Sequence, residues 1–379
     1  MTGILHTELS KRDEWMKKHI IGDDLPFSFF YGKRPSKELL TTWKREFSQI
    51  TDRAAVASVS TDTSAGADGA TRYTSRWSDP ETGLEATCIA ASFPDYPTIE
   101  WTLYLKNNGS ADTPLIENIL GLDISLEKPD DENFMLKTIR GDTCSPAAYE
   151  PIEIDLTNEQ GYVKFAPIFG KPSAGAFPYF NIQAGDSGIL IAIGWPGQWA
   201  ASFYGPYWGR STLYAEAGQE VTCLSLHPGE EIRAQLSVLM FWEGGYARSQ
   251  NLWRRFMNDH NLPKPGGKLV EPFVWHWNSN YHHEETELQM MREYDEHGIH
   301  HDMWGVDAGW CAACTEESWW PCAGDWEVDK ARFPSGMNFL SDEARARGMK
   351  FIMLLAAARQ KHNIRRGGRP RLPVVQGGG

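Results

Sequence analysis

The segment WGVDAGW at residues 304–310 ends an apolar run with a carboxylate, a glycine and a tryptophan. Asp307 stands where a strand of a βα repeat would end, and carboxylates at the carboxyl ends of such strands point into the face that carries active sites. A neighbouring glycine lets the loop turn sharply. Asp307 is therefore the first candidate site residue, and the alternative is an aspartate that caps the loop.

Tryptophan is concentrated around this segment: seven of the 16 tryptophans fall between residues 275 and 326. Sugar rings bind on flat aromatic side chains with carboxylates and amides at the ring edges, so this composition is typical of a carbohydrate site. The alternative is core packing, which we expect of Trp275 and Trp304 more than of the predicted loop residues. Those loop residues are Trp319, Trp320 and Trp326.

Further carboxylates follow in the segment GDWEVD at residues 324–329. Any two of Asp325, Glu327 and Asp329 could act as a general acid and a general base. Acidic residues are also common in solvated loops, and we favour this second interpretation. No GxSxG, Walker or GxGxxG motif occurs, so acyl transfer, nucleotide hydrolysis and dinucleotide redox chemistry have no support.

A metal site is a further alternative, because three cysteines and four histidines lie in this part of the chain. Structural zinc usually takes four ligands in two close pairs, and the second close pair of cysteines is missing. We therefore expect no metal and no other cofactor, and interpret the cysteines as loop thiols. The residues concerned are Cys311, Cys314, Cys322, His282, His283, His300 and His301.

Residues 54–242 are expected to form a β-sandwich, because short alternating segments are broken by Gly, Pro, Asn and Asp. Residues 98–105 alternate with a period of two, whereas 189–193 and 236–242 look like strands buried on both faces. An earlier helix is predicted to start at Ser36, with an apolar stripe at helical spacing. The stripe consists of Leu39, Leu40, Trp43 and Phe47.

After Trp242 the apolar period changes to that of a helix over residues 247–260, and the breaker sequence LPKPGG follows at 262–267. A domain boundary is expected near residue 265. Beyond it, strands and helices alternate, as in a parallel sheet or a (β/α)8 barrel. The expected elements are strand 269–277, helix 284–297 with Leu288, Met291 and Tyr294 on one face, strand 300–307, helix 337–347 and strand 350–355, with Gly298 and Gly348 as left-handed helix caps.

The barrel is expected to be incomplete, because a (β/α)8 barrel takes about 250 residues and residues 269–379 number only 111. The composition also changes after residue 353, where the last 26 residues hold six Lys or Arg and no acid. We therefore expect three parts: a β-sandwich with its linker helix over 1–262, the first barrel units over 263–353, and a disordered basic tail over 354–379.

Charge and hydropathy restrict the partners and the compartment. With 37 Lys and Arg against 50 Asp and Glu, the net charge of −13 argues against nucleic acid and membrane surfaces. No apolar run approaches the ~18 residues that span a bilayer, and the N-terminus lacks the core of a signal peptide. We expect a cytoplasmic protein whose six cysteines are reduced.

Several ordered motifs resemble the melibiase-like α-galactosidases of glycoside hydrolase family 36, over most of residues 25–353. In the second half they are WGVDAGW, GDWEVDKARFP at 324–334 and GMKF at 348–351. In the first half they are RGDTCSPAAYEP at 140–151, GKPSAGAFPYFNIQ at 170–183, IAIGWPGQWAASF at 191–203, LHPGEEIR at 226–233 and QNLWRRFM at 250–257.

The resemblance implies an N-terminal β-sandwich of the supersandwich type, a (β/α)8 catalytic barrel and metal-free retaining hydrolysis of terminal α-galactosides such as melibiose or raffinose. A family-type homo-oligomer is a further implication. Asp307 corresponds to the motif aspartate that hydrogen-bonds galactose hydroxyls, and Trp310 to a tryptophan of the site wall. Trp326 is the third candidate substrate-binding residue.

The chain departs from the family pattern in three ways. Ala308 replaces the second motif aspartate, which removes a hydrogen-bond partner for a sugar hydroxyl. A hydrogen bond to a charged group contributes about 1.5–3 kcal/mol. Residues 354–359 read LLAAAR where the family has a WFEPER-like strand. The nucleophile and the acid/base aspartate of the family lie on the fourth and sixth barrel strands, so we expect no catalytic residue within these 379 residues.

Two expectations follow. The first is an inactive N-terminal portion of an α-galactosidase-like hydrolase, ended by truncation or a frameshift near residue 354. The second is a non-catalytic carbohydrate-binding or assembly fragment, in which the sandwich folds by itself.

Overall fold

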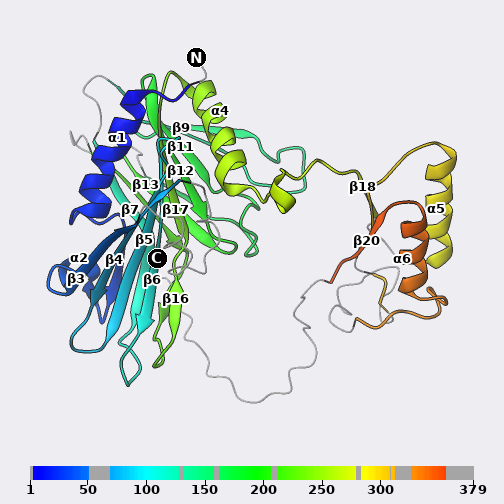
Figure 1. The fold of residues 1–379 in the computed structure, drawn as a ribbon, viewed down its shortest axis with the longest axis horizontal. Coiled ribbons are helices and arrows are strands. Elements are labelled where there is room, and N and C mark those ends of the chain that lie inside the picture. Colours follow the sequence, from blue (N-terminus) through cyan, green and yellow to red (C-terminus); the bar gives the residue numbers. More distant parts are fainter. Residues whose placement is uncertain are drawn as a thin grey trace, which may run out of the picture. The chain divides into compact units, whose positions relative to one another are not determined.

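The computed structural model describes residues 3–50, 69–127, 132–157, 162–205, 212–278, 283–307, 309–311 and 326–355. The chain divides into two compact units, Met1–Pro263 and Lys264–Gly379. Figure 1 labels many of the elements of each unit. The predicted tail over 354–379 lies outside the described residues from residue 356 onward.

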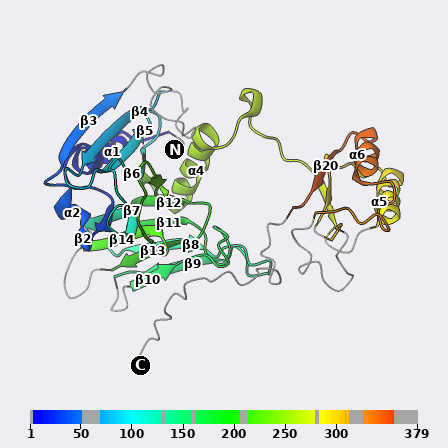
Figure 2. The same cartoon turned by 90° about the horizontal axis from the view of Figure 1, so that it is seen from below.

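The first unit contains two large antiparallel sheets. Within the described residues one sheet has seven strands in the order β10-β13-β14-β7-β1-β2, with β15 paired to β7, and Figure 2 shows β10, β13, β14 and β7 side by side. The bounds are β1 Ser28–Tyr31, β2 Arg34–Pro35, β7 Ile116–Glu127, β10 Tyr162–Phe165, β13 Trp199–Tyr204, β14 Thr212–Gln219 and β15 Cys223–Leu224.

The other sheet has ten strands within the described residues, in the order β3-β4-β5-β6-β17-β12-β11-β8-β9, with β16 paired to β6. The bounds are β3 Lys44–Ile50, β4 Thr71–Ser78, β5 Leu84–Ser92, β6 Thr98–Asn107, β8 Met135–Ile139, β9 Pro151–Asp155, β11 Tyr179–Ala184, β12 Ser187–Gly194, β16 Glu231–Arg233 and β17 Leu236–Glu243.

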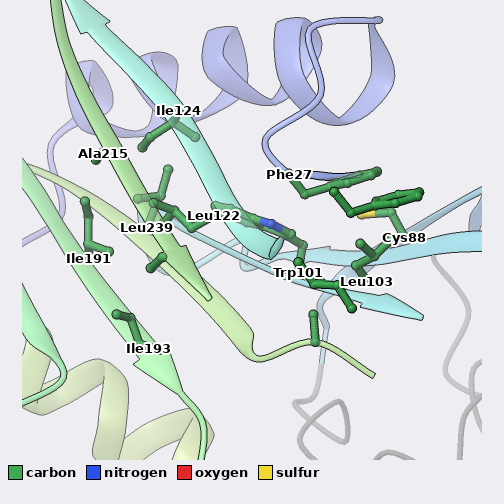
Figure 3. Close-up of a cluster of buried hydrophobic side chains, with 14 of the residues drawn as sticks. Phe27, Cys88, Trp101, Leu103, Leu122, Ile124, Ile191, Ile193, Ala215 and Leu239 are labelled. Carbon is green, nitrogen blue, oxygen red and sulfur yellow. The ribbon is translucent and has the colours of Figure 1, made fainter. Parts of the chain in front are cut away.

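The core lies between the two sheets, because side chains from both enter one buried cluster. Trp101 of β6 and Leu239 of β17 meet Leu122 of β7 and Ala215 of β14 there, as Figure 3 shows. The Trp101 indole N–H donates to the carbonyl of Gly121 at 2.7 Å, so its polar edge is satisfied inside the core. The predicted β-sandwich is confirmed as two large antiparallel sheets that share this core.

The two apolar segments predicted to be strands buried on both faces are β12 and β17. One face of β17 enters the shared core, and the other packs against helix α4, Tyr246–Phe256. Met240 and Trp242 contribute to this second cluster together with Leu252 and Phe256 of α4. A central strand covered on both faces has no solvent side, which is why its sequence does not alternate. A π-helical segment, Met257–Asn261, continues α4.

The helix predicted from Ser36 to Phe47 is wrong beyond its first turn. Helix α2 spans only Ser36–Leu39, and β3 begins at Lys44. Phe47 is 43% exposed and lies opposite Ser75 in the β3–β4 ladder. The Ser36 hydroxyl accepts the backbone N–H of Phe29 instead of capping the helix. Strand pairing here overrides a helical spacing of apolar residues.

An N-terminal helix that the sequence patterns do not indicate precedes the sheets. Helix α1 spans His6–Met16 and continues as a π-helical segment, Lys17–Ile21. Its Glu8 is fully buried and accepts hydrogen bonds from the guanidinium of Arg248 and from the backbone N–H of Glu243 (2.9 Å) and Leu5 (2.8 Å). This buried ion pair ties α1 to the junction of β17 and α4.

The second unit contains a small parallel sheet in the order β18-β19-β20, in which α5 and α6 follow β18 and β19 along the chain. Met291 of α5 and Leu340 of α6 enter one cluster with Trp304 and Val306 of β19, so both helices cover the same face of the sheet. The bounds are β18 Trp275–Asn278, α5 Glu284–Glu296, β19 Met303–Val306, α6 Met337–Ala346 and β20 Lys350–Met353.

The predicted alternation of strands and helices is confirmed in this unit. Gly298 and Gly348 follow the helices with φ of +64° and +80°. The predicted strand from Leu269 is too long, because β18 begins only at Trp275. Val270 and Val274 are 57% and 56% exposed and precede β18, so apolar composition alone does not make a strand here. No helix in the described ranges is long and apolar enough to cross a membrane.

Replacing Glu8 by alanine is expected to destabilise the first unit by about 3–5 kcal/mol, because the partly buried Arg248 guanidinium and two backbone N–H groups would lose their common acceptor. Lys11 of the same helix is the matched control. Its ammonium pairs with Glu243 at 2.8 Å, but the Lys11 side chain is 48% exposed. Lys11→Ala should therefore cost at most about 1 kcal/mol. Urea unfolding followed by circular dichroism measures both, and equal losses would contradict the assignment.

Candidate functional site

The candidate site lies where the parallel strands of the second unit end. Asp307 follows the last residue of β19 directly, and its Oδ2 accepts the indole N–H of Trp277 from β18 at 2.9 Å. The Asp307 side chain is half-buried. The carboxyl ends of parallel strands meet at one edge of a sheet, where open α/β folds bind their ligands. The hydrogen bond therefore fixes one carboxylate oxygen at this edge.

Gly305 makes that hydrogen bond sterically feasible. It lies opposite Trp277 in the β18–β19 ladder. A Cβ on residue 305 would lie 2.4 Å from Cε3 of Trp277, well inside contact distance. The missing side chain lets the indole lie across β19 with its N–H directed at Asp307. This role depends on strand register, and the sequence alone gave no sign of it.

Trp310 and Trp326 lie together beside this edge. Their rings stack at 5.9 Å with an interplanar angle of 29°. The Trp310 indole is 2% exposed, and its N–H donates to the carbonyl of Leu354 at 3.1 Å. Trp326 is partly buried and has φ of +43°. Two of the three predicted site residues are thus in contact, and Trp310 serves as packing between the Asp307 loop and the end of β20.

Arg332 organises the loop after Asp307, a role that the sequence analysis missed. Its buried guanidinium donates to the carbonyls of Gly309 at 2.6 Å and Cys311 at 2.9 Å, and to Oδ2 of Asp329 at 2.8 Å. These bonds hold the pKa of the Asp329 carboxyl below its usual range. Asp329 is therefore ionised and committed to Arg332, which does not suit a proton donor. The DxxR spacing at 329–332 was the available signal.

The other candidates divide between packing and exposure. Trp304 is fully buried, stacks on His276 at 4.0 Å and donates its N–H to Oε2 of Glu287 at 2.8 Å, as the packing alternative expects. Trp275 is 48% exposed and lies beside Trp277 at 4.9 Å, which the packing alternative did not expect. Ala308, Trp319, Trp320 and Asp325 lie outside the described residues.

The cysteines and histidines form no group of three or more with Asp or Glu in the part of the chain that the structure describes. Cys311 is buried and pairs by its backbone with Val328. His301 packs on the ring of Tyr294 at 4.6 Å, and burial lowers its pKa. Cys314, Cys322 and His282 lie outside the described residues, so the three-cysteine alternative falls largely there.

The four described thiols are expected to differ in reactivity. Cys88 lies in the core of the sandwich, where burial raises its pKa to about 12, and Cys311 is also buried. Cys144 and Cys223 are exposed. Because thiolate content and access control alkylation, iodoacetamide should modify Cys144 and Cys223 in the native chain and reach Cys88 and Cys311 only in urea. Peptide mass spectrometry reads the sites, and native alkylation of Cys88 at the rate of Cys144 would be the contrary result.

Gly305→Ala is expected to destabilise the second unit by about 1–3 kcal/mol, because the new methyl group overlaps the Trp277 ring. Trp277→Leu should remove that overlap, so the double variant should lose less stability than the sum of the two single variants. Hydrogen exchange in peptides covering β18–β20 reports on this unit alone. Strict additivity would show that the glycine does not accommodate the indole.

The comparisons with known proteins concern fold only. No protein-family model matches the chain, and no curated protein does. The structure is similar to the GH36 α-galactosidase AgaB from Geobacillus stearothermophilus, with a TM-score of 0.64 and 14% identity over 86% of this chain and 45% of that one. It is also similar to the α-galactosidase from Lactobacillus brevis, with a TM-score of 0.65 and 17% identity over 86% of this chain and 44% of that one.

A third similar structure is the galactosidase domain of the α-galactosidase–sucrose kinase AgaSK, with a TM-score of 0.66 and 13% identity over 87% of this chain and 45% of that one. Variants of AgaA from G. stearothermophilus have been solved in complex with stachyose and with raffinose. The chain spans less than half the length of these enzymes. The resemblance inferred from the motifs is confirmed at the level of fold: the chain is structurally similar to about 45% of a GH36 α-galactosidase, its N-terminal portion.

Proposed function

We propose that these residues are the N-terminal portion of an α-galactosidase of the GH36 type, and that Asp307 binds hydroxyl groups of a terminal α-galactoside. The observation that carries the proposal is the hydrogen bond from the Trp277 indole to Asp307 at 2.9 Å, at the carboxyl end of a parallel strand. The fold similarity and the WGVDAGW motif support it from separate directions.

Asp307 has the chemistry that sugar recognition requires. A carboxylate accepts several hydrogen bonds at once, and hydrogen bonds to charged groups contribute about 1.5–3 kcal/mol each. Trp277 donates to Oδ2, which restricts rotation of the carboxylate. A carboxylate offers about four acceptor sites, so it can serve more than one hydrogen-bond donor at a time. Trp326, the more accessible ring of the stacked pair, is the proposed aromatic wall.

The second unit is proposed to be the first part of a (β/α)8 barrel. Its three parallel strands, with both helices on one face, are the arrangement from which such a barrel grows. Trp275 and Trp277 alternate with His276 along β18, so their side chains project from the face opposite the helices. In a closed barrel that face would be the interior, where Asp307 would meet its substrate.

The substrate class is proposed from the solved similar structures together with the motif. Variants of AgaA were solved with raffinose and stachyose. Melibiose and raffinose are therefore the first substrates to test. The resemblance requires neither a metal nor a cofactor for the retaining reaction.

The 379 residues expressed by themselves are proposed to bind without turnover. Retaining hydrolysis needs a nucleophile and an acid/base carboxyl about 5–5.5 Å apart. The resemblance assigns these groups to the fourth and sixth barrel strands, whereas the described residues of the second unit contain three strands. Asp307 and Asp329 do not replace them, because one is assigned to sugar hydroxyls and the other is paired with Arg332.

A non-catalytic carbohydrate-binding or assembly role is the second candidate. The observation in its favour is that residues 1–263 form a compact unit with their own shared core. Under this proposal sugar binding would not depend on Asp307.

Calorimetric titration of the 379-residue chain with melibiose tests the proposal. We expect saturable binding that Asp307→Asn weakens by about 10- to 100-fold, since a charge-assisted hydrogen bond is lost. Asp302→Asn is the matched control, because Asp302 precedes the same strand at its other end and accepts the backbone N–H of Val274 at 2.7 Å. Hydrolysis of p-nitrophenyl α-galactoside by the purified chain is expected to stay at background.

Two results would contradict the proposal. Equal melibiose affinity of Asp307→Asn and Asp302→Asn would show that the sugar does not bind at the β19 edge. It would favour the non-catalytic carbohydrate-binding or assembly role. Turnover of p-nitrophenyl α-galactoside by the purified chain, with contaminating hydrolase excluded, would show that a competent carboxylate pair exists within these residues.

A further inference from the structure

A cavity of about 440 Å³ lies in the first unit and is lined by residues of that unit alone. It is formed where the segment after the N-terminal helix meets α2, the start of β3 and the end of β4. Ligand sites for small molecules usually have volumes of roughly 300–1,000 Å³. The lining residues are Asp23, Asp24, Leu25, Lys37, Leu40, Thr41, Trp43, Arg45 and Trp77.

Two rigidly held indoles line this cavity. Trp43 and Trp77 are only 7% and 3% exposed. Trp43 packs edge-on against Tyr31 at 6.1 Å, and Trp77 packs edge-on against Phe27 at 5.8 Å. Side chains fixed in this way lose little entropy when a ligand binds. The cavity therefore has a preformed aromatic lining.

The indole N–H groups of both tryptophans are unused. Among the described residues, neither Trp43 nor Trp77 donates its N–H to an acceptor. Both ring nitrogens keep some accessible surface, from which each can donate a hydrogen bond. Because both residues line the cavity, a ligand with oxygen acceptors has two possible donors there.

The cationic groups of the cavity are already neutralised. The Arg45 guanidinium lies 5.2 Å from the Trp77 ring and donates to Asp23 at 3.0 Å, to Ser75 at 2.9 Å and to two backbone carbonyls. The Lys37 ammonium pairs with Asp123 at 2.7 Å. Neither cation is available as a free charge, which disfavours an anionic ligand such as phosphate.

Acceptors complete the rim. Among the side chains lining the cavity, those of Asp23 and Asp24 are 95% and 52% exposed, so both can accept hydroxyl protons while their existing partners remain. Thr41 adds an exposed position at the same rim. Indole rings in the wall, beside carboxylate acceptors and without a free cation, suit a neutral ligand that carries apolar C–H groups and hydroxyls, such as a sugar.

We propose that this cavity is a second carbohydrate site, which takes a neutral mono- or disaccharide on Trp43 and Trp77. It goes beyond the proposed function because it lies in the other unit, uses none of the residues around Asp307 and performs no hydrolysis. Its role is to hold a sugar on the sandwich.

The test uses calorimetric titration of the 379-residue chain with melibiose, maltose, sucrose and inorganic phosphate, each alone. We expect saturable binding of at least one disaccharide and none of phosphate. Trp43→Phe, which removes the N–H donor and keeps an aromatic ring, should weaken this binding about tenfold or more. Thr41→Met, which extends an exposed rim residue into the cavity, should weaken it by a similar factor.

Thr42→Met is the matched control, because the two neighbouring threonines make equivalent bonds. Thr41 donates its hydroxyl to the carbonyl of Glu38 at 2.7 Å and Thr42 to that of Leu39 at 2.8 Å, but only Thr41 lines the cavity. Thr42→Met should leave the affinity unchanged. Circular dichroism measures whether each variant is folded. If Trp43→Phe does not fold, Thr41→Met still tests whether the cavity binds the sugar.

Three results would overturn the inference: no saturable binding of any disaccharide, binding of phosphate in their place, or disaccharide binding indifferent to both Trp43→Phe and Thr41→Met. The proposed function is tested separately by Asp307→Asn. If both sites exist, the titration with melibiose shows two binding events, of which Asp307→Asn removes only the one at the β19 edge and Thr41→Met only the one in the cavity. Binding that Asp307→Asn abolishes and Thr41→Met leaves complete would exclude the cavity, and the opposite result would exclude the β19 edge.

Discussion

The hydrogen bond between the Trp277 indole and Asp307 is the interaction on which the candidate site depends. It requires parallel pairing of β18 and β19 in one register, since only that register puts Gly305 opposite Trp277. A side chain at residue 305 would push the indole away. Backbone register, a missing Cβ and a ring nitrogen thus combine to hold one carboxylate at the carboxyl end of β19. Arg332 and the Trp310–Trp326 stack then hold the loop that follows.

The first unit is stabilised in a different way. Its ten-stranded sheet buries one face against the seven-stranded sheet, and α4 covers part of the other face. The two ends of this unit's sequence are joined by the Glu8–Arg248 pair, which connects residues 240 positions apart. Both candidate sites contain tryptophan rings that pack against neighbouring aromatic rings. In the second unit the N–H of Trp277 is directed at a defined acceptor, Asp307.

The sequence predicted those parts of the fold that rest on local pattern. The strand–helix–glycine alternation of the second unit, the apolar face of α5 with Met291, and the doubly buried strand β17 follow from periodicity and capping. Other parts depend on contacts between distant residues. Helix α1 has few apolar residues and is held by Glu8, whereas Phe47 joins a strand because β4 offers it a partner.

The same distinction applies to the site. Asp307 could be selected from sequence because a carboxylate after an apolar strand is a local signal, and its position at the end of β19 is as expected. Gly305 and Arg332 could not, because their roles appear only once the ladder and the loop are in place. Trp275 and Trp304, grouped together by composition, separate into one exposed and one fully buried ring, since adjacent strands present them on opposite faces.

The central claim is that the Asp307 carboxylate recognises hydroxyl groups of a galactoside. A crystal structure of the chain soaked with melibiose tests it most directly. We expect a galactosyl hydroxyl oxygen about 2.5–3.0 Å from an Asp307 carboxylate oxygen, with the Trp277 bond intact. Ordered melibiose bound elsewhere, with the β19 edge empty of sugar in the same crystal, would contradict it.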